Sequence, residues 1–238
     1  MRLGLNQPYF FPYIGHFSLI QHVDQYWILD TVQYISDGWM HRNRILKPQG
    51  GWQYFGVPTK KHPYTSQIND VYLNDQLDWR GKIFRQLEHY RKKAPYYEQT
   101  IEVVQKIFEH PWERVSDLNS CITREVCAYL GIKTPIYRLS EEHLNMEQPH
   151  TADEWGLNVC RAVPGVTEYW NAPGGASFYD QRKYQAAGIE IKFQKMILDE
   201  YPQKGNPFEP GLSIIDVMMF NSVEKIQQMM EHYEFVEV

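Results

Sequence analysis

Hydrophobic and polar positions alternate at the start of the chain and then change to helical spacing. The alternation over residues 2–7 predicts a β-strand, and the apolar stripe over 14–23 predicts an amphipathic helix. Short apolar runs at 26–29 and 52–57 predict two further strands. The first quarter of the chain therefore mixes strands with a helix.

Helical periodicity dominates the middle of the chain. Apolar residues share one face over 79–90, 97–108 and 115–130, and Pro95 and Gly131 fit a helix start and a helix stop. This block, at about 75–131, is large enough to form a lobe over one edge of a sheet. We therefore expect a helical insertion or subdomain there.

Strands and helices alternate again in the second half. We expect strands at 135–139, 168–170 and 189–193. The expected helices lie at 151–163 with a Thr151–Glu154 capping box, at 178–187, and after the N-caps Ser213 and Ser222. Such alternation requires crossover connections, so it predicts an α/β fold with a mainly parallel sheet flanked by helices. We interpret residues 1–238 as a single domain.

The charge balance argues against polyanionic partners. Lys and Arg total 24 against 29 Asp and Glu, which gives a formal net charge of −5. A mildly acidic chain has no bulk attraction for nucleic acid or an anionic membrane surface. No apolar run approaches the ~20 residues of a membrane helix, and the opening MRLGLNQPYF lacks the apolar segment of a signal peptide. We therefore expect a cytoplasmic protein without membrane insertion.

Cysteine, histidine and aromatic residues narrow the chemistry further. The three cysteines fall within apolar helical patterns, which is typical of reduced core thiols. No Cys pair has metal-ligand spacing and the nine His form no HxH or HExxH pattern, so we predict no metal site. Aromatic residues reach 15%. Tyr and Trp suit sites that hold sugars or other polar rings, although they equally serve as core residues.

The loop NQPYFFPYIGH at residues 6–16 is the first candidate ligand site. Ligands of parallel sheets bind beyond the carboxyl ends of the strands, and this loop follows the first predicted strand. Two prolines stiffen it, Gly15 allows close backbone approach, and Gln7 and Tyr9 offer hydrogen-bonding groups. The alternative is a structural turn rich in aromatic residues.

His16, at the end of this loop, is a candidate catalytic residue. The segment resembles the strand–HxGH–helix opening of adenylate-forming and nucleotidyl-transferring enzymes, whose histidines stabilise a phosphate in the transition state. Tyr13 stands where the first His of that motif belongs, and the loop is longer than in those enzymes. The alternative is an ordinary histidine on a helix face.

A second candidate segment covers residues 32–45 and also follows a predicted strand. Gln33 lies near its start, and the cluster HRNRI supplies Arg42, Asn43 and Arg44. Two arginines around an asparagine form a dense set of donors that suits phosphate or carboxylate. The alternative is a solvated turn with surface arginines.

Two further candidates lie in the C-terminal half. Tyr169 precedes a loop with Gly174 and Gly175, which can cradle an anion, although Pro-Gly-Gly is also a plain turn. Asp216 lies one turn into an otherwise apolar helix, where a carboxylate either caps the helix or serves a site. We treat Asp216 as a candidate general base.

The candidate segments are expected to meet in one site. If each follows a strand of one parallel sheet, right-handed crossovers return all of them to the same carboxyl edge. We therefore expect Gln7, Arg42 and Tyr169 to line a single pocket.

Ordered sequence blocks resemble the WbqC-like protein family over nearly the whole chain. The blocks are NQPYFFPYIGHF, ILDTVQY, HRNRI, GWQYFGVP, WRGK, YRKKAPYYE, TEYWNAPGG, FYD, GIEIKFQ and FEPGLSIIDVMMFN. The chain departs from the family pattern at Thr31, which follows Asp30 where a second Asp is usual, and at His16, where an aromatic residue is usual.

This resemblance implies a function in bacterial surface-polysaccharide (O-antigen) biosynthesis. Some members are described as glycine transferases, so it implies acyl or aminoacyl transfer, glycyl transfer included, to an amino sugar or nucleotide-linked sugar. Amide formation needs ATP or a preactivated acyl donor, and the sequence leaves open which one is used. It also leaves open whether the chain forms a homo-oligomer. The alternative is a non-catalytic sugar- or nucleotide-binding or scaffolding protein, because no catalytic triad, metal set or P-loop is recognisable. We favour an enzyme.

Overall fold

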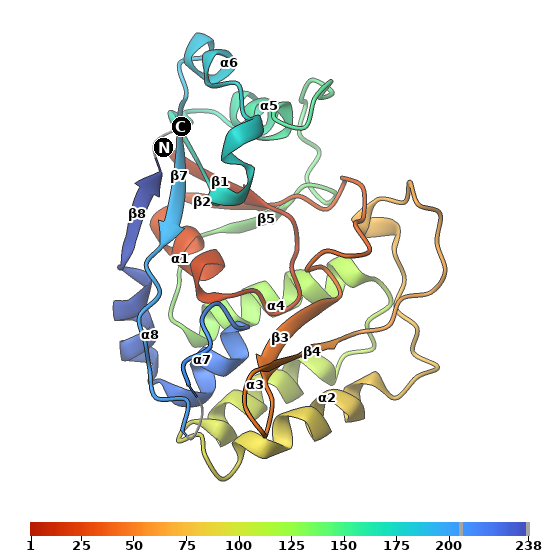
Figure 1. Ribbon diagram of the computed structural model, residues 1–238. Helices are drawn as coiled ribbons and strands as arrows, with labels where there is room; N and C mark the ends of the chain where they lie inside the picture. Colours follow the sequence, from red (N-terminus) through yellow and green to blue (C-terminus); the bar gives the residue numbers. More distant parts are fainter. Residues whose placement is uncertain (205–206, 237–238) are drawn as a thin grey trace.

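A mostly parallel sheet forms the centre of the molecule (Figure 1). The structure, a computed structural model, describes residues 1–204 and 207–236. Within these residues the sheet has six strands in the order β5-β2-β1-β6-β7-β8. The strands are β1 (Arg2–Asn6), β2 (Gln25–Ile28), β5 (Ile136–Arg138), β6 (Glu168–Asn171), β7 (Glu190–Met196) and β8 (Tyr233–Val236). All neighbours pair in parallel except β7 and β8. The predicted α/β fold is confirmed.

Strand β1 lies where the direction of winding reverses. The chain first adds β2 and β5 on one side of β1 and then returns to add β6 and β7 on the other side. Leu5 pairs with Trp27 of β2, and Leu3 pairs with Tyr169 of β6. The carboxyl ends of β1 and β6 therefore open beside each other at a topological switch point, which is where α/β sheets commonly bind ligands.

Helices cover both faces of the sheet, because successive side chains of each strand point to opposite faces. Leu5 and Trp27 belong to a core cluster with α5 (Glu154–Ala162), whereas Tyr26 and Ile28 belong to a cluster with α1 (Ile14–His22). Figure 1 shows α5 and α6 on one side of the sheet and α1, α4 and α7 on the other. The remaining helices are α2 (Trp79–Leu87), α3 (Tyr97–Phe108), α4 (Val115–Tyr129), α6 (Gln181–Ala186), α7 (Ile214–Phe220) and α8 (Val223–Met230), with 3-10 turns η1 (Ile68–Asp70), η2 (Glu88–Tyr90) and η3 (Pro173–Phe178).

The helices α2, α3 and α4 form in the segment where helical periodicity dominates. Their buried side chains, such as Ile83, Val104 and Leu118, belong to the same continuous core cluster as Phe17 of α1. Gly131 ends the block with a φ of +74°, as expected for a glycine that stops a helix. No helix in the described ranges is both long and apolar enough to cross a membrane.

The segment that contains Arg42 and Arg44 differs from the prediction. It is not a loop but strand β3 (Arg42–Leu46), which pairs with β4 (Trp52–Gly56) in an antiparallel hairpin separate from the main sheet. Gly50 and Gly51 have φ values of +99° and +67° and allow the turn between these strands. The hairpin lies next to α2 and α7 (Figure 1).

Hydrogen bonds at the start of α7 connect the loop at residues 6–16 and the β3–β4 hairpin to the C-terminal part of the chain. The predicted N-cap Ser213 is confirmed, since its hydroxyl accepts a hydrogen bond from the Ile215 amide at 3.3 Å. The same hydroxyl donates to the Phe11 carbonyl at 2.8 Å, and the Ser213 amide donates to the Arg44 carbonyl at 2.9 Å. The Ile214 amide donates to the Pro12 carbonyl at 2.9 Å.

Asp216 lies in a fully buried polar cluster next to this junction. Its carboxylate accepts hydrogen bonds from the Tyr90 hydroxyl at 2.6 Å, the Tyr201 hydroxyl at 2.7 Å and the Gln203 amide at 2.9 Å. The Tyr90 hydroxyl in turn accepts from the Leu46 amide at 2.9 Å. Burial raises the pKa of Asp216 to about 6, although the three donors act in the opposite direction.

This raised pKa predicts a stability change with pH. The folded chain holds a proton on Asp216 between its ordinary pKa of 3.8 and about 6, where the unfolded chain does not, so stability falls as the pH rises through this range. We expect the unfolding free energy of the wild type, relative to Asp216→Asn, to fall by roughly 3 kcal/mol between about pH 4 and pH 7. Urea titrations of both proteins measure this difference.

The half-buried Asp180 gives a control at a second carboxylate. A hydrogen bond from Arg182 lowers its pKa, so the stability difference between wild type and Asp180→Asn should be constant above about pH 4 and should change with pH only below it. A difference between wild type and Asp216→Asn that stays constant over the whole range would contradict the prediction.

Candidate functional site

A cavity of about 710 Å³ opens at the switch point between β1 and β6. Its volume falls in the usual range for small-molecule sites. The lining comes from the ends of β1, β2 and β6, the start of α5 and the loop with η3: Leu5, Asn6, Gln7, Tyr9, Leu29, Val32, Gln33, Ile35, Pro149, His150, Thr151, Ala152, Trp155, Gly156, Tyr169, Asn171, Ala172, Gly174, Gly175, Phe178 and Tyr179. We call it the switch-point cavity.

Asn171 organises one wall of this cavity. Its side-chain amide donates to the hydroxyl of Tyr169 at 2.9 Å and to the hydroxyl of Tyr179 at 2.6 Å, while its carbonyl accepts from the Ala172 amide at 2.7 Å. Burial raises the pKa of both tyrosines, so their hydroxyls stay neutral. The wall thus presents neutral hydroxyls in fixed positions, which can donate and accept hydrogen bonds.

Helix α5 approaches this wall closely because it carries a glycine. A Cβ atom on Gly156 would lie 2.5 Å from the ring of Tyr169, so any larger residue would push the helix or the ring away. Tyr169 is packed from its other side by Tyr184, with ring centroids 5.6 Å apart. Its position is therefore set from two elements.

The start of α5 forms part of the cavity rim. The Glu154 carboxylate accepts from the amides of His150 at 2.7 Å and Thr151 at 3.3 Å, as the predicted capping box requires. The Thr151 hydroxyl, however, bonds the Asp153 carboxylate instead of a backbone amide, and Asp153 is the N-cap. Lys183 bridges Asp153 and Glu154 at 3.1 and 2.8 Å, which fixes this rim to α6.

The opposite rim is the segment after β2. Asp30 is fully buried there and accepts from the amide and hydroxyl of Ser140 at 3.1 and 2.6 Å, with Arg138 at 3.3 Å. Burial raises the pKa of Asp30. Three residues after Asp30, the Gln33 side-chain amide donates to the Tyr64 carbonyl at 2.9 Å. These bonds hold Val32 and Gln33 at the cavity.

Half of the predicted site residues share this cavity. They are Gln7, Tyr9, Gln33, Tyr169, Gly174 and Gly175. Among the described residues, none donates to or accepts from the Gln7 side chain, so its amide is available to a ligand. None of the lining residues in the described ranges is Asp, Glu, Lys or Arg. The cavity therefore offers amides, hydroxyls and aromatic rings rather than charges.

Arg42 does not share the cavity with Gln7 and Tyr169, so the expectation of a single pocket for these three residues is wrong. Arg42 lines a separate cavity of about 440 Å³ beside α2. The physical reason is that β3 belongs to the hairpin, and its ends do not lie at the carboxyl edge of the main sheet.

The neighbours of Arg42 also lie away from the switch-point cavity. The Asn43 amide is buried and donates to the Phe10 and Phe11 carbonyls at 3.0 and 2.8 Å, which fastens the first loop to the hairpin. Arg44 donates to the Gly211 carbonyl at 3.2 Å. Gly15, too, is enclosed, because a Cβ there would meet the ring of Tyr13 at 2.4 Å.

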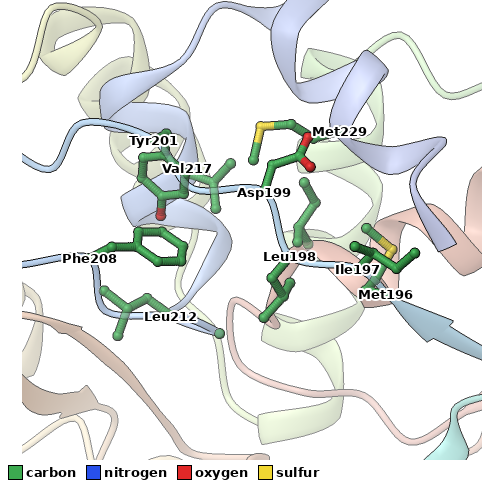
Figure 2. A pocket seen from close by; sticks show the side chains of 11 residues that line it. Met196, Ile197, Leu198, Asp199, Tyr201, Phe208, Leu212, Val217 and Met229 are labelled. Carbon is green, nitrogen blue, oxygen red and sulfur yellow. The ribbon is translucent and has the colours of Figure 1, made fainter.

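The two residues predicted as catalytic are buried elsewhere. His16 bonds the Tyr26 hydroxyl at 2.8 Å, and burial lowers its pKa to about 3, so the ring stays neutral. Asp216 lies near the apolar cavity of Figure 2, which Tyr201, Phe208 and Val217 help to line. That cavity measures about 10 Å³, the space of about one water molecule, so it holds no substrate. The structure brings neither residue to the switch-point cavity.

Sequence reasoning missed Asn171, Tyr179 and the start of α5. The signal for Asn171 was present, because it is the last residue of a strand and precedes the Pro-Gly-Gly loop. Within the described residues, no group of three or more His, Cys, Asp or Glu side chains is arranged to hold a metal ion.

Comparison with known proteins agrees with the sequence blocks. The model of the WbqC-like protein family matches residues 7–228. A relative from Mycobacterium tuberculosis (strain ATCC 25618 / H37Rv), the uncharacterized protein Rv1507c, is 30% identical over 223 residues, which cover 92% of this chain and 93% of the relative. No solved structure matches the chain at a significant level. Because the match extends over nearly the whole sequence, the chain belongs to the WbqC-like protein family.

Proposed function

We propose that this protein is a cytoplasmic transferase of surface-polysaccharide biosynthesis that binds an amino sugar, free or nucleotide-linked, in the switch-point cavity. The observation that carries the proposal is the cavity itself: about 710 Å³ at a topological switch point, lined by neutral amides, hydroxyls and aromatic rings. The transferred group is acyl or aminoacyl, glycyl included, and this part rests on the family resemblance.

The chemistry of the lining supports a sugar. A sugar ring carries hydroxyls that both donate and accept hydrogen bonds, and Gln7, Gln33 and the Tyr169 and Tyr179 hydroxyls are groups of the same kind. Its apolar faces suit aromatic side chains such as Trp155. A phosphate would instead favour Lys or Arg, which the described lining lacks.

Amide formation sets further requirements. The acyl group must arrive activated, either through ATP or on a preactivated donor, and the sugar amine must lose a proton. Histidine commonly acts as a general base, and His150 lies exposed on the rim of the cavity. We include His150 in the proposal as the candidate for this step.

One observation favours a second candidate function, a sugar-binding protein without chemistry. The described lining contains neither a carboxylate nor a lysine that could act on the substrate. Incubation of the protein with a UDP-linked amino sugar, ATP and glycine, followed by mass spectrometry, separates the two functions. A product heavier by one glycyl residue supports the transferase; binding of the sugar nucleotide without product in this and other acyl-donor mixtures supports the binding protein.

Asn171 provides a direct test of the cavity. Replacing it by Ala removes the amide that fixes the hydroxyls of Tyr169 and Tyr179, so we expect the affinity for a UDP-linked amino sugar to fall about tenfold or more. Isothermal titration calorimetry measures the change. The exposed Asn145, which lies outside the lining, gives the control Asn145→Ala, for which we expect wild-type affinity. Equal affinities of the wild type, Asn171→Ala and Asn145→Ala would show that the sugar does not bind in this cavity.

Two glycines of the same cavity provide a second test. The Cβ of Gly156→Ala would meet the Tyr169 ring, so we expect a loss of about 1–3 kcal/mol in the free energy of unfolding together with weaker sugar binding. At Gly174 nothing lies within 4 Å of an added Cβ, so Gly174→Ala should retain wild-type stability. Urea unfolding compares the two variants, and equal stabilities would show that the contact between α5 and β6 is not tight.

A further inference from the structure

The β3–β4 hairpin exposes arginines together with aromatic rings on one face. Residues paired across an antiparallel ladder point to the same side, so Arg44 shares a face with Tyr54, whereas Asn43 and Phe55 face the core. The Arg42 guanidinium carbon lies 4.6 Å from the centre of the Tyr54 ring, within range of a cation–π contact. This contact helps to hold the guanidinium group beside the Tyr54 ring.

Arg42 lines a cavity of about 440 Å³ between the hairpin and the start of α2, which we call the hairpin cavity. One part of its wall is cationic and consists of Arg42 and Lys82. The other part is largely apolar and consists of Phe55, Val57, Pro58, Leu77 and Trp79, with His41, Tyr54, Gly56 and Asp78 completing the lining. Leu77 is 56% exposed although it is apolar. The cavity therefore suits a ligand with an anionic group and an apolar ring.

The cations of this cavity have no buried carboxylate partner among the described residues. The Lys82 side chain forms no ion pair or hydrogen bond within the described residues. The buried Arg42 Nε has no acceptor in the same ranges, and one Nη donates to the Asp37 carbonyl at 3.0 Å. The Asp37 carboxylate, 3.7 Å away, is 98% exposed and therefore screened by water. An anion could bind both cationic side chains without displacing a buried partner.

The other titratable groups at the hairpin cavity do not cancel this charge. The Asp78 carboxylate is bonded to Arg85 at 3.0 Å and to the Gly81 amide at 2.9 Å, and the bond to Arg85 lowers its pKa. Burial lowers the pKa of His41, and the Arg42 charge lowers it further, so this ring favours its neutral form. Arg42 and Lys82 thus remain as the uncompensated charges.

A short segment separates the hairpin cavity from the switch-point cavity. Gln33 and Ile35 line the switch-point cavity. Tyr34, between them, is buried and bonds through its hydroxyl to His41 Nδ1 at 2.7 Å, and His41 lines the hairpin cavity. The switch-point cavity therefore lies directly against this segment, and the hairpin cavity is connected to it through the hydrogen bond between Tyr34 and His41.

We propose that the hairpin cavity binds a nucleoside phosphate, with its phosphate on Arg42 and Lys82 and its ring against the apolar wall of Leu77 and Pro58. Two cationic side chains that line one cavity bind phosphate through charge-assisted hydrogen bonds, and the apolar wall removes the ring from water. Different residues carry this proposal and the sugar assignment of the switch-point cavity, so each can fail alone. In the proposed transferase, a nucleotide-bearing donor would lie in the hairpin cavity and the sugar in the switch-point cavity, with residues 33–35 between them.

Calorimetry with ATP, ADP, inorganic phosphate and adenosine tests the proposal. We expect ATP and ADP to bind, and phosphate or adenosine alone to bind more weakly, because each lacks one half of the ligand. Lys82→Glu and Arg42→Gln should each weaken ATP binding about tenfold or more. Lys82 is exposed and unpaired, so Lys82→Glu should fold like the wild type, which circular dichroism and the melting temperature verify.

Lys92→Glu is the matched control, because Lys92 is also exposed, lies in the turn between η2 and α3 outside the hairpin cavity, and undergoes the same charge change. It should keep wild-type affinity for ATP. Equal weakening by Lys92→Glu and Lys82→Glu, or an absence of ATP and ADP binding, would overturn the proposal. So would ATP binding that Asn171→Ala abolishes and Lys82→Glu leaves intact, since the nucleotide would then occupy the switch-point cavity.

Discussion

The parallel pairing of β1 with both β2 and β6 is the constraint on which the rest of the molecule depends. Because β1 is paired on both edges, the chain continues from β1 to β2 on one side and later returns to form β6 on the other side. The connections therefore diverge at the carboxyl end of β1. The divergence leaves room for the switch-point cavity. Alternation along the same strands sends Leu5 and Trp27 toward α5, and it sends Tyr26 and Ile28 toward α1. One pairing pattern thus fixes the layers and the site together.

Much of the architecture follows from local pattern. Residues 2–6, 25–28 and 168–171 form strands close to where alternation and short apolar runs predict them, and the stripes of α2, α3 and α4 are helical. Strand β4 lies where an apolar run predicts it, but β3 and its pairing with β4 escaped prediction, because a short alternating segment after another strand fits a loop, a sheet strand or a hairpin strand equally well. The hairpin is stabilised by the core-facing side chains of Asn43 and Phe55, whose partners lie far away in the sequence and are not visible in the local pattern.

The site was predictable only where it depends on strand ends. Gln7 and Tyr169 each lie on or next to a strand of the main sheet, so the carboxyl-edge rule placed both correctly at the cavity. His16 and Asp216 were misplaced because burial is a long-range property. His16 is enclosed by Tyr26 of β2, and Asp216 by Tyr90 and Tyr201, none of which local periodicity relates to them. A polar residue in an apolar stripe therefore identified a buried hydrogen-bonding cluster rather than a reactive group.

The hydrogen bonds at the start of α7 determine how much of the chain must be synthesised before the backbone groups of the N-terminal half all have their partners. The Phe11, Pro12 and Arg44 carbonyls receive their donors from residues 213 and 214, about two hundred residues downstream for the first two. Until that part has left the ribosome, the first loop and β3 expose unsatisfied backbone groups and an open apolar surface. A chain that ends before residue 213 therefore lacks the donors for these three carbonyls near its own beginning.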